Sequence, residues 1–233
     1  MLGYFSYKNM KDILLIANWK MNPGTAKEAQ ELFETVANAV EGVAGVKVVL
    51  CPPFVYIPEI VRAAPSVALG VGGQDCFWEG KGAFTGEVSP SMLKELGCEY
   101  VILGHSERAK YLGETEDMVQ KKVAAALSAD LKVVLCVGEN EQTPADRENL
   151  IVVYEPEWAI STEGGRAADV SRVAEKVAAM RKTFKAGPIL YGGSVDSSNI
   201  ASFLKEAGVQ GALVGGASLN AAEFISLVKN AAM

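Results

Sequence analysis

Eight short apolar segments recur along the chain, and helical segments separate nearly all of them. The apolar segments are residues 13–17, 46–51, 67–72, 100–104, 132–137, 151–154, 188–193 and 211–216. Apolar runs of this length, without polar alternation, are typical of parallel strands buried on both faces. Eight strand–helix repeats favour a closed barrel over an open sheet. The sequence therefore predicts an α/β fold, a (β/α)8 barrel in which residues 1–233 form one domain and residues 1–11 an N-terminal extension.

One of these repeats is too short for a full outer helix. Only residues 140–150 connect the fifth apolar segment to the sixth, and a parallel crossover with its helix needs at least about 10–12 residues. Thr143 is a suitable helix cap, Pro144 suits a first helical position, and Asp146 suits a first turn. We therefore predict that the helix after the fifth strand is reduced to a stub of one or two turns.

Composition limits the classes of partner. The chain has a formal net charge of −6, which disfavours nucleic acid and anionic membranes because both require a basic surface. No apolar run approaches the length of a membrane span, and the first residues lack the apolar core of a signal peptide. The four cysteines are scattered without a C-x-x-C pair. This spacing favours reduced, buried thiols in a cytoplasmic protein.

The sixth apolar segment leads into a carboxylate. Glu155 stands where the strand must end, because Pro156 cannot donate a backbone hydrogen bond and disfavours helix in the residue before it. A loop follows, and its Gly164–Gly165 pair can act as a hinge. A carboxylate at a strand exit, under a loop that can close, suits proton transfer away from water. The alternative is a strand-ending glutamate that faces solvent, since carboxylates are mostly exposed.

Other polar residues and glycines lie at the ends of the apolar segments or shortly after them. They are Asn18, Lys20, Gln74, His105, Glu107, Glu139, Gly192, Gly193, Ser194, Gly215 and Gly216. In a (β/α)8 barrel the carboxyl ends of all strands meet at one face, where the chemistry takes place. Each residue alone has a structural explanation, and one histidine with dispersed cysteines does not make a metal site. Together they predict a small-molecule site in which the last two glycine-rich loops bind an anion.

Several of these segments resemble those of the triosephosphate isomerase family. The matching segments are NWKMN (18–22), GQD (73–75), GAFTGE (82–87), GHSER (104–108), CVGE (136–139), YEPEWAI (154–160), YGGSV (191–195) and VGGASL (214–219). The similarity extends from Leu15 to the C-terminus. It implies a TIM barrel and an aldose–ketose isomerase that interconverts dihydroxyacetone phosphate and glyceraldehyde 3-phosphate through an enediolate. Such an enzyme belongs to glycolysis and gluconeogenesis.

The resemblance implies a role for individual residues. Glu155 is expected to be the base, His105 to polarise the carbonyl as a neutral imidazole, and Lys20 to offset the charge of the enediolate and the phosphate. Asn18 completes this catalytic group with a supporting hydrogen bond. The resemblance further implies supporting roles for Glu107 and Cys136, and phosphate contacts from Ser161, Ser194, Gly215 and Gly216.

The resemblance also implies how the protein assembles and what it requires. It predicts no cofactor and no metal, because protein groups carry every proton and charge. It predicts a homodimer through loop 73–87, with Thr85 reaching the partner's site, and it agrees with a cytoplasmic location. Neither nucleic acid nor a membrane is expected as a partner.

The loop after Glu155 departs from the family pattern. Glu157, Ser161 and Glu163 replace the residues usual there, and we expect them to slow closure of a lid over residues 156–165. Ala109 replaces a second arginine usual after GHSER. Two alternatives to the isomerase stay open. One is a sugar-phosphate lyase or aldolase, and the other is a phosphate-binding barrel that acts as a dimeric scaffold with an impaired lid.

Overall fold

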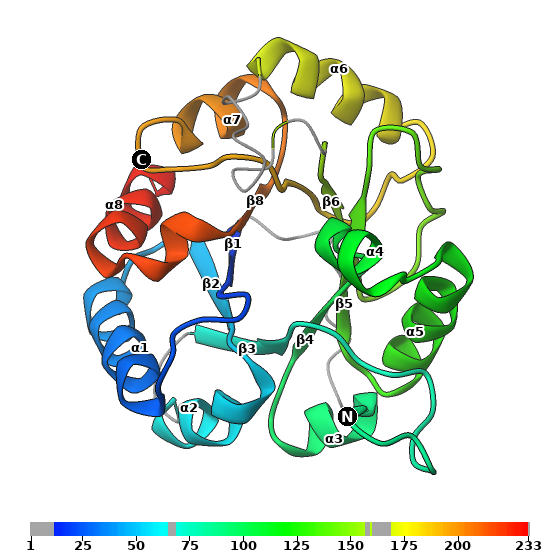
Figure 1. Ribbon diagram of the computed structural model, residues 1–233. Helices are drawn as coiled ribbons and strands as arrows, with labels where there is room; N and C mark the ends of the chain where they lie inside the picture. Colours follow the sequence, from blue (N-terminus) through cyan, green and yellow to red (C-terminus); the bar gives the residue numbers. More distant parts are fainter. Residues whose placement is uncertain (1–11, 65–68, 157–158, 160–168, 233) are drawn as a thin grey trace, which may run out of the picture.

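The structure, a computed structural model, describes residues 12–64, 69–156, 159 and 169–232. Eight parallel strands form a closed barrel in chain order, in which β1 also pairs with β8 (Figure 1). The strands are β1 (Ile13–Asn18), β2 (Val46–Cys51), β3 (Leu69–Gly73), β4 (Tyr100–Leu103), β5 (Lys132–Val137), β6 (Leu150–Tyr154), β7 (Ile189–Tyr191) and β8 (Gly211–Val214). The predicted (β/α)8 barrel is confirmed.

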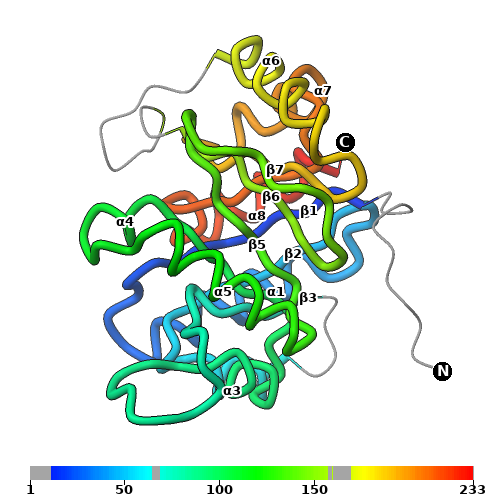
Figure 2. The backbone as a smooth tube through the Cα atoms, turned by 90° about the vertical axis from the view of Figure 1, so that its right-hand side faces the viewer, coloured from blue at the N-terminus to red at the C-terminus, as the bar shows by residue number. Residues whose placement is uncertain are grey.

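Helices surround the barrel, except that α4 lies over one end of it (Figure 1). They are α1 (Ala26–Val40), α2 (Ile57–Ala63), α3 (Pro90–Glu95), α4 (Ser106–Leu112), α5 (Glu116–Ser128), α6 (Val170–Met180), α7 (Ile200–Glu206) and α8 (Ala221–Ala231), with the short 3-10 helices η2 (Phe54–Tyr56) and η5 (Gly216–Leu219). The side view shows α4 at one end of the barrel, beyond the point where the strands end (Figure 2). This end is the face at which the sequence places the site.

Side chains of each strand alternate between two apolar layers. In β5, Val134 and Cys136 belong to the group that the barrel encloses. Leu135 and Val137 belong to the larger group that packs between strands and helices. Because successive side chains of a strand point to opposite faces, one continuous apolar segment fills both layers. The strand segments show no polar alternation because both of their faces are buried in apolar layers.

Side chains that cap helices fix where several helices begin. Thr25 accepts a hydrogen bond from the backbone N–H of Glu28, and the Glu28 carboxylate accepts one from the backbone N–H of Thr25. This reciprocal pair satisfies two N–H groups that the first turn of α1 leaves free. Thr115 caps α5 by accepting from the backbone N–H of Met118 at 3.3 Å. Both caps therefore fix the residue at which the helix begins.

The connection between β5 and β6 differs from the prediction. Residues 138–149 contain turns and extended chain but no helix, so the stub expected over 143–146 does not form. The prediction of a missing full helix is right, whereas the prediction of one or two turns is wrong. A helix this short has few internal hydrogen bonds and needs an apolar face to pack against the barrel. Residues 139–149 are all charged or polar except Pro144 and Ala145, and they offer no such face.

Asp146 stabilises this segment in place of a helix. Its carboxylate accepts hydrogen bonds from the backbone N–H of Lys185 at 2.9 Å and from that of Ala186 at 2.8 Å. These bonds, led by the one from Ala186, lower the pKa of the Asp146 carboxyl below its ordinary value of 3.8. The segment is thereby tied to the turn that precedes β7.

Two expectations lie outside the described residues. They are the N-terminal extension over residues 1–11 and most of the lid, including Glu157, Ser161 and Glu163. No helix in the described parts of the chain combines the length and the apolar character that crossing a membrane requires.

The Asp146→Asn variant is expected to be less stable at pH 7 by about 1 kcal/mol, a small value for bonds to a charged group because the carboxylate is exposed. A carboxyl whose pKa is lowered on folding stabilises the protein above its unfolded pKa, and this contribution disappears as the pH falls through the folded pKa. The difference between variant and wild type should therefore shrink below about pH 4. Urea unfolding at several pH values measures it.

Glu148→Gln is the matched control, because Glu148 is an exposed acid of the same segment. It should unfold like the wild type. Equal stability of Asp146→Asn and wild type at pH 7 would show that these hydrogen bonds do not hold the segment.

Candidate active site

Residues from several strand ends line one small cavity at the carboxyl face of the barrel. They are Asn18, Lys20, His105, Glu155, Gly192, Gly193, Leu213 and Gly215. The four side chains expected to do the chemistry are all among them. The closed barrel explains this, because it turns every strand end toward the same axis.

Glu155 lies at the exit of β6 and is buried, with 3% of its surface exposed. Its Oε1 lies 3.1 Å from Nε2 of His105. Its Oε2 accepts a hydrogen bond of 3.1 Å from the backbone N–H of Ser106, the first residue of α4. The solvent-facing alternative for this glutamate is therefore wrong. A buried carboxylate is retained where hydrogen bonds satisfy its oxygens.

His105 caps α4 with its own ring. Its Nδ1 accepts a hydrogen bond of 3.2 Å from the backbone N–H of Glu107. A nitrogen that accepts carries no proton, so in the neutral ring the proton belongs to Nε2. Nε2 faces Glu155. The geometry thus provides a neutral imidazole that donates from Nε2 into the cavity.

Lys20 has a left-handed backbone, with φ of 55°. The Asn18 side chain holds this conformation, because its Oδ1 accepts a hydrogen bond of 3.0 Å from the backbone N–H of Lys20. Gln74 donates from Nε2 to the carbonyl of Lys20 at 2.9 Å. Nζ of Lys20 lies 2.5 Å from Oε1 of Glu107. Strained backbone of this kind is common at functional sites, where the surroundings enforce it.

The residues expected at the phosphate are only partly brought together. Gly215 lines the cavity, and Gly216 is the next residue and begins η5. The backbone N–H and the hydroxyl of Ser194 both donate to the carbonyl of Ala159, at 2.9 Å and 2.8 Å. Both hydrogen-bond donors of Ser194 are therefore engaged by Ala159, a residue of the lid segment. Ser161 lies outside the described residues.

Cys136 lies in β5 inside the barrel and interacts with Glu155. Burial, followed by the nearby Glu155 carboxylate, raises the pKa of the Cys136 thiol well above its ordinary value. A thiol that stays protonated beside a carboxylate can donate a weak hydrogen bond to it. All four cysteines are free and buried.

The loop over residues 73–87 carries a compact aromatic group. The rings of Phe77 and Trp78 stack with centroids 4.0 Å apart, and those of Phe77 and Phe84 lie 4.6 Å apart. Phe84 remains 42% exposed, and Thr85 is exposed beside it. Met21, which follows Lys20, is 94% exposed. Large apolar side chains exposed next to a site are typical of surfaces that bind another protein.

A buried ionic cluster behind the cavity was not predicted. It consists of Asp75, Arg108, Glu114 and Lys122. Nζ of Lys122 lies 2.9 Å and 2.8 Å from the two oxygens of Asp75 and also donates to Glu114. Arg108 contacts Asp75 at 2.8 Å and Glu114 at 3.1 Å. Burial raises the pKa of the Asp75 carboxyl against the opposing effect of Lys122.

This ionic cluster joins the loop after β3 to α4 and α5. A sequence signal for it exists, because Lys122 stands beside the buried Val123 and only four residues before the buried Ala126 of α5. In the described parts of the chain, no three histidine, cysteine or carboxylate side chains are grouped to hold a metal ion.

Comparisons with known proteins agree with this geometry. The family model for triosephosphate isomerase matches residues 13–231. The triosephosphate isomerase of Moorella thermoacetica is 42% identical over 94% of this chain and 98% of its own. The triosephosphate isomerase of Dehalococcoides mccartyi is 39% identical over 96% of this chain and 98% of its own. The crystal structure of triosephosphate isomerase from Bartonella henselae has a TM-score of 0.81 at 32% identity, over 94% of this chain and 98% of that one. The chain belongs to the triosephosphate isomerase family.

Proposed function

We propose that this protein interconverts dihydroxyacetone phosphate and glyceraldehyde 3-phosphate, and that it does so as an enzyme of glycolysis and gluconeogenesis. The family of the chain supports the reaction. The observation that carries the residue assignment is the meeting of Lys20, His105 and Glu155 at one cavity. A base, a neutral proton donor and a cation at one point are what a proton transfer beside a carbonyl requires.

In the proposed mechanism, Glu155 removes a proton from the carbon next to the substrate carbonyl. Both oxygens of its carboxylate are engaged in the described state, one with His105 and one with the Ser106 N–H. Glu155 must release at least one of these partners before an oxygen can reach the substrate. Once Nε2 of His105 loses Glu155, its proton is free to polarise the carbonyl oxygen. Approach of the substrate thus readies the base and the proton donor together.

Lys20 stabilises the negative charge that develops in the enediolate. Its side chain enters the cavity next to Gly215, where a Cβ on residue 215 would lie 3.3 Å from Cε of Lys20. We propose that the phosphate group lies against Gly215, Gly216, Ser194 and Ser161, close to this ammonium. Glu155 then returns the proton to the neighbouring carbon, and His105 passes a proton from the hydroxyl oxygen to the former carbonyl oxygen, so that hydroxyl and carbonyl exchange places. These steps require no cofactor, because protein side chains carry each proton and charge.

The arrangement disfavours the alternative reactions. A lyase that forms a Schiff base requires an uncharged lysine in an apolar pocket, whereas Lys20 is ion-paired with Glu107. A scaffold without activity would have no use for an imidazole whose proton is fixed toward a buried carboxylate.

We further propose a homodimer formed through the loop over residues 73–87. The exposed Phe84 and Met21 supply apolar surface, and Thr85 would reach the partner's site. A cytoplasmic location is also proposed, and the four free cysteines support it because thiols stay reduced there.

The Glu155→Gln variant is expected to lower kcat by on the order of 10³-fold, because an amide keeps the shape but cannot accept the proton. A coupled isomerase assay measures the rate, and the melting temperature should stay close to that of the wild type. Glu141→Gln is the control, because Glu141 also lies beyond the carboxyl end of a strand but does not line the cavity. Activity of Glu155→Gln near the wild-type level would remove Glu155 from the mechanism.

The Thr85→Arg variant is expected to weaken the dimer, because a buried arginine without a partner is costly. Sedimentation velocity over a concentration series should show a dimer for the wild type and a shift toward monomer for the variant. Thr35→Arg, on the exposed face of α1, should sediment like the wild type. A wild-type protein that is monomeric at every concentration would contradict the proposed assembly.

A further inference from the structure

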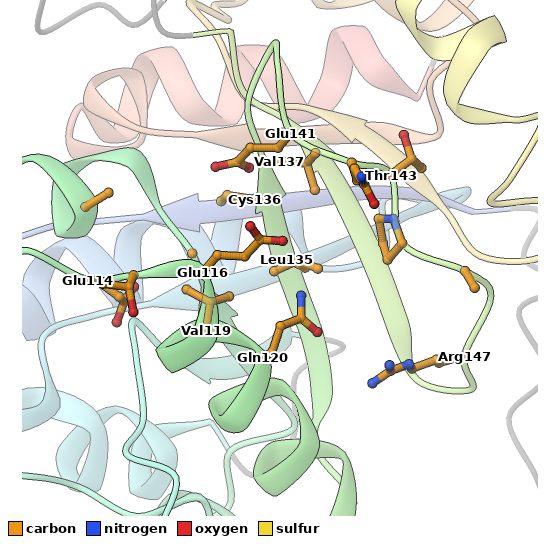
Figure 3. Close-up of a pocket in the computed structure, with 16 residues that line it drawn as sticks. Glu114, Glu116, Val119, Gln120, Leu135, Cys136, Val137, Glu141, Thr143 and Arg147 are labelled. Carbon is orange, nitrogen blue, oxygen red and sulfur yellow. The ribbon is translucent and has the colours of Figure 1, made fainter.

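A second pocket lies outside the barrel, between α5 and the segment 138–149 that replaces the missing helix (Figure 3). Its volume is about 270 Å³. It shares no lining residue with the cavity that contains Glu155. The volume lies just below the range of about 300–1,000 Å³ that is typical of sites for drug-sized ligands. A small metabolite therefore fits its size.

One wall of this pocket is apolar. Leu135 and Val137 belong to the outward-facing layer of β5, and Val119 belongs to α5. In a complete (β/α)8 unit, an outer helix would cover this part of the strand. Here the extended segment passes over it and leaves room for a ligand's apolar side chain.

The other walls carry charges of both signs. Glu116 comes from the first turn of α5, while Glu141 and Arg147 come from the two ends of the segment that covers β5 (Figure 3). Glu114 also lines the pocket, but Arg108 and Lys122 of the buried ionic cluster balance its charge. In the described parts of the chain, the guanidinium of Arg147 has no ion-pair or hydrogen-bond partner. The Glu141 carboxylate already accepts a hydrogen bond of 2.8 Å from the backbone N–H of Gly138. The pocket thus offers a ligand the Glu116 carboxylate and the Arg147 guanidinium beside an apolar wall.

We propose that this pocket is a binding site for a small α-amino acid with an apolar side chain. The ammonium group would face Glu116, the carboxylate would face Arg147, and the side chain would lie against Leu135 and Val119. Arginine suits the second of these roles because its planar fork matches a carboxylate. A simple amine would leave Arg147 unused, and a simple acid would meet two carboxylates. A ligand with both charges can pair with Glu116 and with Arg147.

Titration calorimetry of the full chain with L-leucine tests this proposal. We expect saturable binding of one leucine per chain. Two truncated probes test the charges separately: 3-methylbutylamine lacks the carboxylate, and 4-methylpentanoate lacks the ammonium. Each should bind about tenfold more weakly or worse, because each loses a charge-assisted contact.

Variants of the pocket residues test whether leucine binds there. Arg147→Gln should lower the affinity for leucine about tenfold and leave the affinity for 3-methylbutylamine unchanged. Glu116→Gln should lower the affinity for 3-methylbutylamine, and its affinity for 4-methylpentanoate should not fall. Arg62→Gln, on the surface of α2, is the matched control and should bind leucine normally. Glu155→Gln should also bind leucine normally, so the outcome does not depend on the proposed isomerase activity.

Three results would overturn the proposal. One is no binding of L-leucine, L-valine or L-phenylalanine at millimolar concentration. The second is binding of 3-methylbutylamine as tight as that of leucine, which would indicate a site for simple cations. The third is an unchanged leucine affinity in Arg147→Gln, which would place the ligand elsewhere.

Discussion

The chemistry of the cavity depends on the hydrogen bond from the backbone N–H of Glu107 to Nδ1 of His105. A serine, threonine or aspartate in this position would cap α4 equally well, but none has a second donor that points into the cavity. The imidazole caps with one nitrogen and donates with the other. The preceding N–H of the same turn, that of Ser106, donates to Oε2 of Glu155. One helix start therefore sets the tautomer of His105 and the position of the Glu155 carboxylate.

Polar contacts rather than apolar packing hold this helix start in place, because α4 itself buries no side chain. Arg108 joins it to the buried ionic cluster through Asp75 and Glu114. Glu107 joins it to Lys20, across the mouth of the barrel. A buried ion pair adds little net stability against an apolar substitute, but breaking one partner leaves a costly buried charge. Such a cluster specifies where α4 lies more than it stabilises the fold.

The sequence predicts the parts that local chemistry and strand order determine. Continuous apolar segments predicted the strands, and the position of Glu155 before Pro156 predicted a carboxylate at the exit of β6. The stub over residues 143–146 was wrong because cap and first-turn signals cannot replace an apolar face. The left-handed backbone of Lys20 and the contacts of Lys122 could not be predicted, because they depend on Asn18, Asp75 and Glu114 meeting in space.

The barrel tolerates the loss of an outer helix because close packing elsewhere fixes the strands beside the site. Gly104, which precedes His105, has φ of 70°, and a Cβ there would lie 3.2 Å from the carbonyl of Cys136 and 3.3 Å from Val119. This close approach of β4, β5 and α5 does not involve the segment 138–149. Asp146 needs only to keep that segment over the barrel. The outer wall beside β5 can therefore vary, and open a pocket, without moving His105.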